Sequence, residues 1–233
     1  MNAVQHVVDG YTDTLSSGTR AGPAGGGTIP AATPAPCTSH GDVYGLRGDP
    51  DEGVILSPAY AVVAESAVDI AARDALLDRA MGPRWRRKSS HKLRRGRLPS
   101  QGLAFLAKNG GGSVVGTVRL WDVCAGPGGP AALLLGPLAV DPDVKSAGIG
   151  SQLMRHAIAE AKRLGHGAIL LVGDVAYYAR FGFSAEKTGG LAMPGPYERH
   201  RFLALELVTG TLDGAAGVLQ ASGRRTAPEH KAA

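Results

Sequence analysis

The sequence predicts one folded domain of the mixed α/β class. Three observations support this fold class. The apolar run 131–140, the amphipathic stretch 148–164 and the apolar run 168–172 follow one another as a βαβ unit. Upstream, two apolar runs flank the glycines of 109–112, as in a β-hairpin. The chain of 233 residues and 23.9 kDa is long enough for one domain with a sizeable core.

Composition divides the chain into three parts. Residues 1–55 are dominated by Gly, Pro, Ala, Ser and Thr, and such a segment buries too little apolar surface to fold, so we expect a flexible leader. Residues 56–210 carry the periodic apolar segments and are expected to form the domain. Residues 211–233 are expected to form a C-terminal tail.

The first half of the domain is expected to contain a strand, a helix and a hairpin. The run 59–65 predicts a strand, and 66–82 predicts a helix with Ser66 as its N-cap and Gly82 as its stop. The basic segment 83–97 follows, with eight Lys or Arg and no acid. The runs 102–108 and 113–123 then form the hairpin strands.

The second half is expected to contain the βαβ unit, a short helical turn at 175–182 and a last strand at 201–207. Within the long helix, one apolar stripe is expected to pack on the sheet, and it contains Ile149, Leu153, Ala157, Ala161 and Leu164. The strand 131–140 is interrupted by Gly136-Pro137. Because proline donates no ladder hydrogen bond, this pair predicts a bulge or an edge.

Charge and cysteine content limit the classes of function. The net charge of +5 and the pI of 9.4 favour an anionic ligand slightly over a cationic one. Cys37 and Cys124 lie far apart without a CxxC pair, which argues against a disulfide framework and a zinc site. The histidines at 91, 156, 166 and 200 show no ligand spacing, so we predict no metal site and ordinary surface roles for them.

No secretory or membrane signal is visible in the sequence. The first thirty residues lack a continuous apolar core, and no stretch of about 18 apolar residues occurs. We therefore expect a cytoplasmic protein without a membrane partner.

The turn between the strand 131–140 and the following helix is a candidate anion site. The first N–H groups of a helix are unpaired, and together with the helix dipole they favour a negative charge. Gly148 and Gly150 would let an anion approach the backbone, and Lys145 would add charge. The turn could equally be a tight loop that uses glycine for its φ angle. A Walker loop is absent, and Leu153 stands where a dinucleotide fingerprint needs glycine.

The stretch "LLLGPLAVDPDVKSAGIGSQLMRHAIAEAKRLGHGAILLVGD" followed by "YYARFGF" resembles the core of the GNAT superfamily of N-acetyltransferases. In that family a Gln/Arg-x-x-Gly-x-Gly/Ala turn binds the pyrophosphate of acetyl-CoA, and a Tyr four residues before the Gly of a "GF" pair lies near the thioester sulfur. Here the turn matches 145–150, with Lys145 in the Gln/Arg place, and Tyr178 precedes Gly182-Phe183. The resemblance extends more loosely over residues 57–210.

The resemblance implies a GNAT-like acyl-CoA N-acyltransferase fold, with a mostly antiparallel central sheet splayed between two strands and helices on both faces. It implies acetyl-CoA as cosubstrate, and the residues that it assigns to cofactor binding are Leu138, Ala139, Val140, Lys145, Ser146, Ala147, Gly148, Ile149, Gly150 and Ser151. Two departures bear on affinity. Ala147 stands where many relatives have a second cation, and Lys145 presents a point charge rather than a planar fork.

The resemblance also suggests two catalytic groups. The backbone N–H of Leu138 would donate a hydrogen bond to the acetyl carbonyl as negative charge develops, unless Pro137 is an incidental edge proline. Tyr178 would protonate the departing CoA thiolate as general acid, with Tyr177 as the neighbour that could exchange roles with it. The alternative for Tyr178 is a core tyrosine beside Phe181 and Phe183.

The sequence leaves the general base open between Asp174, Asp122, Glu65 and a water chain. Asp174 is also a candidate N-cap for the short helical turn. The basic segment 84–97 has three interpretations: a wall over an anionic substrate, a contact with nucleic acid or ribosome, or a solvated helix face.

These features favour an N-acetyltransferase that moves an acetyl group from acetyl-CoA directly to an amine of a small molecule or a protein. The alternative is a catalytically silent CoA-binding or interaction module with a basic partner-binding face. A nucleic-acid-binding protein centred on 84–97 is a third hypothesis, although nucleic acid is not the expected partner. The acceptor, the acyl-chain length and the oligomeric state, including a homodimer, stay open.

Overall fold

The computed structural model describes residues 60–144 and 148–226, so the expected leader lies outside the described residues. The strands are β1 (Tyr60–Ala64), β2 (Ala104–Asn109), β3 (Val114–Cys124), β4 (Ala131–Val140), β5 (Ala168–Val172), β6 (Leu191–Ala192), β7 (Phe202–Glu206), β8 (Gly217–Val218) and β9 (Gln220–Ala221). The α-helices are α1 (Ile70–Met81), α2 (Ser89–Arg94), α3 (Ile149–Arg163) and α4 (Val175–Ala179). Short 3₁₀ turns occupy Ala67–Asp69, Pro83–Arg87, Pro142–Val144, Glu186–Thr188 and Arg199–Arg201.

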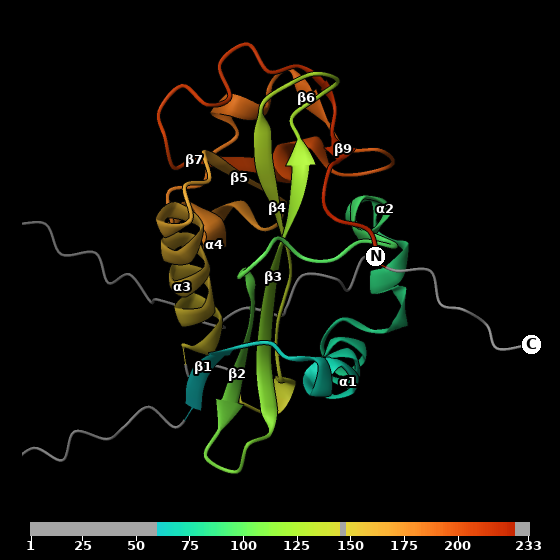
Figure 1. The fold of residues 1–233 in the computed structure, drawn as a ribbon, viewed down its shortest axis with the longest axis vertical. Coiled ribbons are helices and arrows are strands. Elements are labelled where there is room, and N and C mark those ends of the chain that lie inside the picture. Colours follow the sequence, from blue (N-terminus) through green and yellow to red (C-terminus); the bar gives the residue numbers. More distant parts are fainter. Residues whose placement is uncertain (1–59, 145–147, 227–233) are drawn as a thin grey trace, which may run out of the picture. The chain divides into compact units, whose positions relative to one another are not determined.

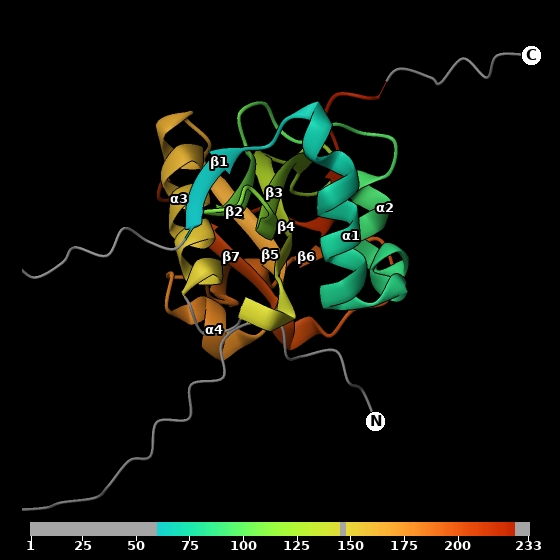
Figure 2. The ribbon, with the colours of Figure 1, turned by 90° about the horizontal axis from the view of Figure 1, so that it is seen from below.

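The main sheet has the strand order β1-β2-β3-β4-β5-β7, with β9 pairing with the far end of β3. All neighbours in it are antiparallel except β4 and β5, which are the two strands of the predicted βαβ unit. Figure 1 shows α1 and α2 on the same side of the sheet, and Figure 2 shows them on the face opposite to α3 and α4. The predicted mixed sheet with helices on both faces is therefore confirmed.

The predicted splay is visible between β4 and β5. These two strands pair only at Leu133 with Ile169 and at Leu134 with Leu170, and they part beyond that point. On the other side, β4 shifts register against β3 between the Leu135 and Leu138 pairs, which places the bulge at Gly136-Pro137 as the sequence predicts. The peptide bond between Gly136 and Pro137 is cis. The bulge and the end of the β4–β5 pairing fall at neighbouring residues, so the sheet opens there.

The helix α3 follows its predicted pattern closely. Its predicted stripe is buried against the sheet, except for Leu164, which caps the helix and is 41% exposed. The helix α1 follows its pattern less well. The apolar positions that the sequence predicts for the inner side of this helix include Val68, Leu76 and Leu77. Leu76 and Leu77 are buried, whereas Val68 lies in the 3₁₀ turn before α1 and is 88% exposed, and Arg73 is buried. Arg73 can occupy the inner face because it forms an ion pair with the buried carboxylate of Glu65.

The C-terminal segment departs from the prediction. The expected tail begins at residue 211, yet Leu212 and Leu219 are buried and β9 pairs with β3. Further along, the Leu98 N–H donates to the Arg224 carbonyl. The structured part of the domain therefore extends at least to residue 226. It does so because Leu212 and Leu219 are buried and β9 pairs with a strand that is remote in the sequence.

Candidate active site

A cavity of about 80 Å³ lies where β4 and β5 part. Its wall on β4 includes Gly136, Pro137 and Leu138, and its wall on the other side includes Leu171 and Tyr178. The remaining lining residues come mostly from the end of α1 and the basic segment, and they are Met81, Trp85, Lys88, Ser90, Arg94, Leu135 and Val172. The structure thus brings together Leu138 and Tyr178, the two residues for which the sequence suggests catalytic roles.

The backbone of Leu138 is oriented toward this opening. Asp141 N–H donates to the Val115 carbonyl of β3, so the backbone groups of Asp141 face β3. Because successive residues of a strand direct their N–H and C=O groups to opposite edges, Ala139 also faces β3 and Leu138 faces away from it. The Leu138 N–H therefore points toward the side on which β5 has parted from β4.

Tyr178 is held rigidly in the cavity wall. Its ring packs edge-on against Tyr177 and Phe183, with centroid separations of 4.9 and 5.9 Å. The glycine at 173 makes room for it, because a Cβ there would lie 2.1 Å from Cε2 of the ring. Burial, and secondarily the neighbouring Tyr177, raise the pKa of the Tyr178 hydroxyl above its usual value. The phenol thus keeps its proton at neutral pH.

The core role and the site role of Tyr178 are therefore compatible, since the ring packs in the core while the residue lines the cavity. Tyr177 is buried as well, but it does not line this cavity. The placement favours Tyr178 over Tyr177 as the residue that faces a ligand.

The carboxylates that the sequence offered as bases lie in other settings. Asp174 caps α4 by accepting the Tyr177 N–H at 2.8 Å, as its alternative interpretation predicts. Glu65 is 4% exposed and pairs with Arg73 and Arg119. Asp122 lies on β3, where its carbonyl accepts from the C-terminal segment. None of these three side chains lines the cavity that contains Tyr178.

The predicted anion turn is described only in part, because Lys145, Ser146 and Ala147 lie outside the described residues. Gly148 caps α3 with a φ of 70°, and a Cβ placed on it would meet no atom within 4 Å. The first helical hydrogen bond runs from Gln152 N–H to the Gly148 carbonyl. The N–H groups of the preceding residues, Ile149, Gly150 and Ser151, therefore have no helical acceptor and can bind an anion.

A second cavity of about 220 Å³ adjoins the first, with which it shares the lining residues Trp85, Arg94 and Pro137. Four arginines line it, from α1, the basic segment and β3: Arg73, Arg86, Arg94 and Arg119. Asp74, His91, Leu77 and Trp121 complete its wall. Burial, helped by the neighbouring Arg94 charge, lowers the pKa of His91, so this imidazole is neutral at pH 7.

Sequence reasoning assigned no individual role to Arg94 or Lys88, which both line the first cavity. One local signal was present, since Ser90 lies one helical turn before Arg94 and its hydroxyl accepts from Arg94 Nη2 at 3.1 Å. The position of Arg94 beside the Gly136-Pro137 bulge depends on long-range packing, and the sequence around Arg94 does not indicate it.

Comparisons with known proteins agree with this architecture. Residues 100–185 match the family model described as the acetyltransferase (GNAT) domain. The chain is 28% identical over 156 residues to the uncharacterized N-acetyltransferase YhbS of Escherichia coli strain K12, an alignment that covers 67% of this chain and 92% of YhbS. It is 33% identical over 75 residues to the uncharacterized N-acetyltransferase YjhQ of the same strain, covering 31% of this chain and 41% of YjhQ.

A solved structure of YhbS has a similar fold. The crystal structure of the E. coli GNAT family N-acetyltransferase YhbS in complex with CoA superposes with a TM-score of 0.61 at 27% identity, covering 71% of this chain and 91% of that one. No helix within residues 60–144 and 148–226 has the length and hydropathy needed to cross a bilayer. The family match over residues 100–185, the relative YhbS and the shared fold all indicate a GNAT-type acetyltransferase domain in this chain.

Proposed function

We propose that this protein is an N-acetyltransferase that moves an acetyl group from acetyl-CoA directly to an amine of a small molecule or a protein. One observation carries the proposal: the Leu138 N–H and the Tyr178 side chain converge on one cavity at the point where β4 and β5 part. Donor groups on opposite walls of a buried opening suit a reaction that develops charge on both a carbonyl oxygen and a leaving sulfur.

The described residues fit acetyl-CoA as cosubstrate. The turn before α3 offers unpaired N–H groups and open space above Gly148 for a pyrophosphate, and the opening between the strands leads to Tyr178. The relative YhbS has been crystallised with CoA, which supports the same ligand here. The residues that would hold it are Leu138, Ala139, Val140, Gly148, Ile149, Gly150 and Ser151, joined by Lys145, Ser146 and Ala147 from outside the described residues.

The chemistry that acetyl-CoA supplies is an activated acyl carbon bound to a good leaving group. Leu138 would donate its N–H to the carbonyl oxygen, and one such donor in a dry site contributes about 3 kcal/mol to transition-state stabilisation. Tyr178 would deliver its phenolic proton to the sulfur as the carbon–sulfur bond breaks and the carbon–nitrogen bond forms. The attacking nitrogen would release one proton to water, and the tyrosinate would regain a proton from water. Because the pKa of Tyr178 is raised, the proton is present when it is needed.

The cofactor turn is tested with Gly148→Glu. A carboxylate at the start of α3 opposes an anion there, so we expect acetyl-CoA binding to fall at least a hundredfold in a calorimetric titration at moderate salt. Gly165→Glu is the matched control, because Gly165 lies after the other end of α3 with a φ of 80° and open space around it. Equal affinity in the two variants would mean that the pyrophosphate binds elsewhere.

The general acid is tested with Tyr178→Phe, which removes the hydroxyl and keeps the ring packing. We expect turnover, measured by release of the CoA thiol, to fall about a hundredfold or more while acetyl-CoA affinity is retained. Tyr177→Phe is the matched control and should retain turnover. Unchanged turnover in the Tyr178→Phe variant would contradict the proposed role of Tyr178 as general acid. Acetyl-CoA binding without turnover on any amine would instead favour the silent binding module.

A further inference from the structure

Arg94 is a buried cation without an acidic partner in the described part of the chain. The residue is 6% exposed. Its Nε donates to the Ser90 carbonyl at 3.2 Å and its Nη2 donates to the Ser90 hydroxyl at 3.1 Å, both within the same helix. A guanidinium has five N–H groups, so these two bonds leave three for another acceptor.

The remaining N–H groups of Arg94 lie at the candidate active site. Nη1 is 3.8 Å from the position that a Cβ on Gly136 would occupy, so it approaches the β4 bulge. Arg94 also lines both cavities, together with Trp85 and Pro137. Its free donors are therefore at the boundary between the opening that holds Tyr178 and the larger cavity beside it.

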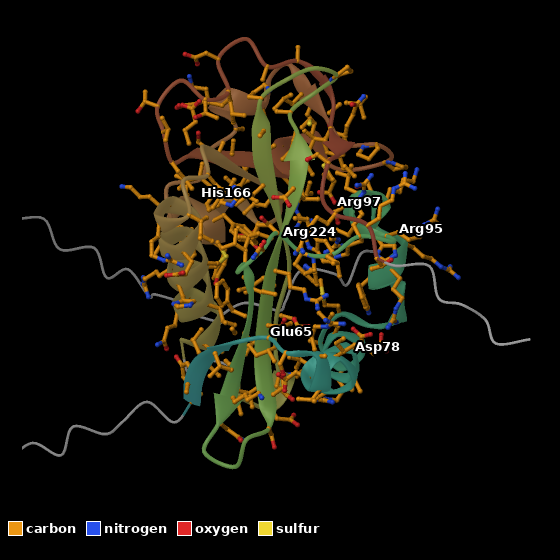
Figure 3. All side chains as sticks on the ribbon, viewed as in Figure 1. Glu65, Asp78, Arg95, Arg97, His166 and Arg224 are labelled. Carbon is orange, nitrogen blue, oxygen red and sulfur yellow. The ribbon has the colours of Figure 1, made fainter. Side chains whose placement is uncertain are left out.

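The other arginines of the larger cavity differ from Arg94, because each has a carboxylate partner. Arg73 and Arg119 pair with Glu65, and Arg86 pairs with Asp78 at 2.7 Å. Figure 3 labels both acids, Glu65 just after β1 and Asp78 on α1. Their charges are compensated within the protein, so they do not require a ligand.

The smaller cavity has the same excess of positive charge. Lys88 lines it beside Arg94, and its lining residues include neither Asp nor Glu. Partial burial, and then the charges of Arg201 and Arg94, lower the pKa of Lys88. Burial likewise lowers the pKa of Arg94, to about 10, and the guanidinium therefore still carries its charge at neutral pH. Arg94 and Lys88, neither of which pairs with an acid among the described residues, thus line the smaller cavity.

A buried, unpaired charge costs folding free energy, and an anion bound beside it would remove that cost. We propose that the acceptor is a small amine bearing an anionic group, a carboxylate or a phosphate, and that this group pairs with Arg94. The proposal rests on the acetyltransferase function proposed above and names the substrate class of the same site. The larger cavity, of about 220 Å³, is smaller than the roughly 300–1,000 Å³ of pockets for drug-sized ligands, which favours an acceptor of few atoms.

Direct binding tests the anion site without catalysis. The full-length protein is titrated in a calorimeter with glutarate, inorganic phosphate and the neutral analogue glutaramide. We expect glutarate or phosphate to bind at least tenfold more tightly than glutaramide, and Arg94→Met to remove that preference. Arg94→Lys, which keeps the charge and loses the fork, should retain part of it. Absence of anion binding, or unchanged binding in Arg94→Met, would overturn the proposal.

Arg95→Met is the matched control, because it removes the same charge from the adjacent, exposed position. Figure 3 labels Arg95 beside α2. We expect this variant to bind glutarate and phosphate as the unaltered protein does. Equal losses in the two variants would show a general effect of net charge and would also overturn the proposal.

Steady-state kinetics then separate this proposal from the proposed function. The acceptors are β-alanine, O-phosphoethanolamine and the neutral β-alaninamide, with acetyl-CoA binding measured in parallel. We expect Arg94→Met to raise KM at least tenfold for the anionic amine that is preferred, with kcat and the neutral amide little affected. If kcat falls equally on charged and neutral amines, Arg94 stabilises the transition state and does not bind the anionic group of the acceptor. That result would overturn the proposal.

The two failures give different results. If β-alaninamide is acetylated as well as the anionic amines, the acetyltransferase function holds and the anionic acceptor does not. If anions bind through Arg94 while acetyl-CoA does not bind, the anion site holds and the acetyltransferase function fails.

Discussion

The paired arginines Arg73 and Arg119 and the unpaired Arg94 line the same cavity and differ in their partners. Arg73 and Arg119 converge on Glu65, and Arg119 Nε lies 2.7 Å from Oε2 of that carboxylate. Arg94 donates only to Ser90, within its own short helix. Burial of a charge is therefore not in itself a sign of function. The distinguishing feature is whether the fold supplies the counter-charge.

The paired set has a structural explanation. Glu65 directly follows β1, Arg73 lies on α1 and Arg119 lies on β3, so one carboxylate links three elements. The unpaired Arg94 links nothing beyond its own turn. Its charge is thus available to a ligand. A charge without a partner lowers the free energy of unfolding, and the same charge can bind an anionic ligand.

The largest expected effect comes from breaking the paired set with Glu65→Gln. Removing one partner of a buried ion pair leaves charge uncompensated, and this typically costs about 3–5 kcal/mol of unfolding free energy. Chemical denaturation measures it. Asp74→Asn is the control, because Asp74 pairs with Arg73 from a position that is 39% exposed, and its loss should cost about 1 kcal/mol or less. Equal costs would remove the distinction between buried and exposed partners.

The opposite sign is expected for Arg94→Met. The variant exchanges an unpaired buried charge for an apolar side chain of similar length, so we expect unfolding free energy to rise by about 1 kcal/mol. Arg95→Met should change it by less than about 0.5 kcal/mol, since that residue is exposed. A clear loss of stability in Arg94→Met would mean that Arg94 is a structural member of the fold, like Arg73.

The smallest effect is the pH dependence of that gain. In the folded state the pKa of Arg94 is about 10, below its ordinary value of 12.5, so the unfolded chain binds the proton more tightly. The stability of the native protein relative to Arg94→Met therefore rises as the pH passes upward through about 10. Thermal unfolding of the pair between pH 8 and pH 10 should show a narrowing gap in unfolding free energy. A constant gap would indicate that the charge of Arg94 carries no cost.

The sequence predicted the parts of the fold whose signals are local. The hairpin followed from its glycines, α3 from its apolar stripe, and the opening of the sheet from Pro137 together with the family resemblance. Leu138 and Tyr178 line one cavity, and the family resemblance implies that both residues lie near the same thioester.

What local patterns could not predict depends on partners remote in the chain. Arg73 is buried because it pairs with Glu65. Hydrophobic periodicity alone predicts that an arginine is exposed. Leu219 is buried and β9 pairs with β3 more than ninety residues upstream, so the domain does not end at 210. The basic segment contains eight Lys or Arg, and its sequence does not indicate which of them are buried. Arg94 is buried, whereas the adjacent Arg95 is exposed.

The cavity that Arg94 lines also has an optical consequence. The chain contains two tryptophans, Trp85 and Trp121, and both line this cavity. The indole of Trp121 donates to the Gly136 carbonyl at 2.6 Å, and the Arg86 guanidinium lies 4.4 Å from the centre of the Trp85 ring. The tryptophan emission of the protein therefore originates entirely from the cavity wall, and a fluorescence titration with excitation that selects tryptophan over the six tyrosines can detect a ligand there without any label.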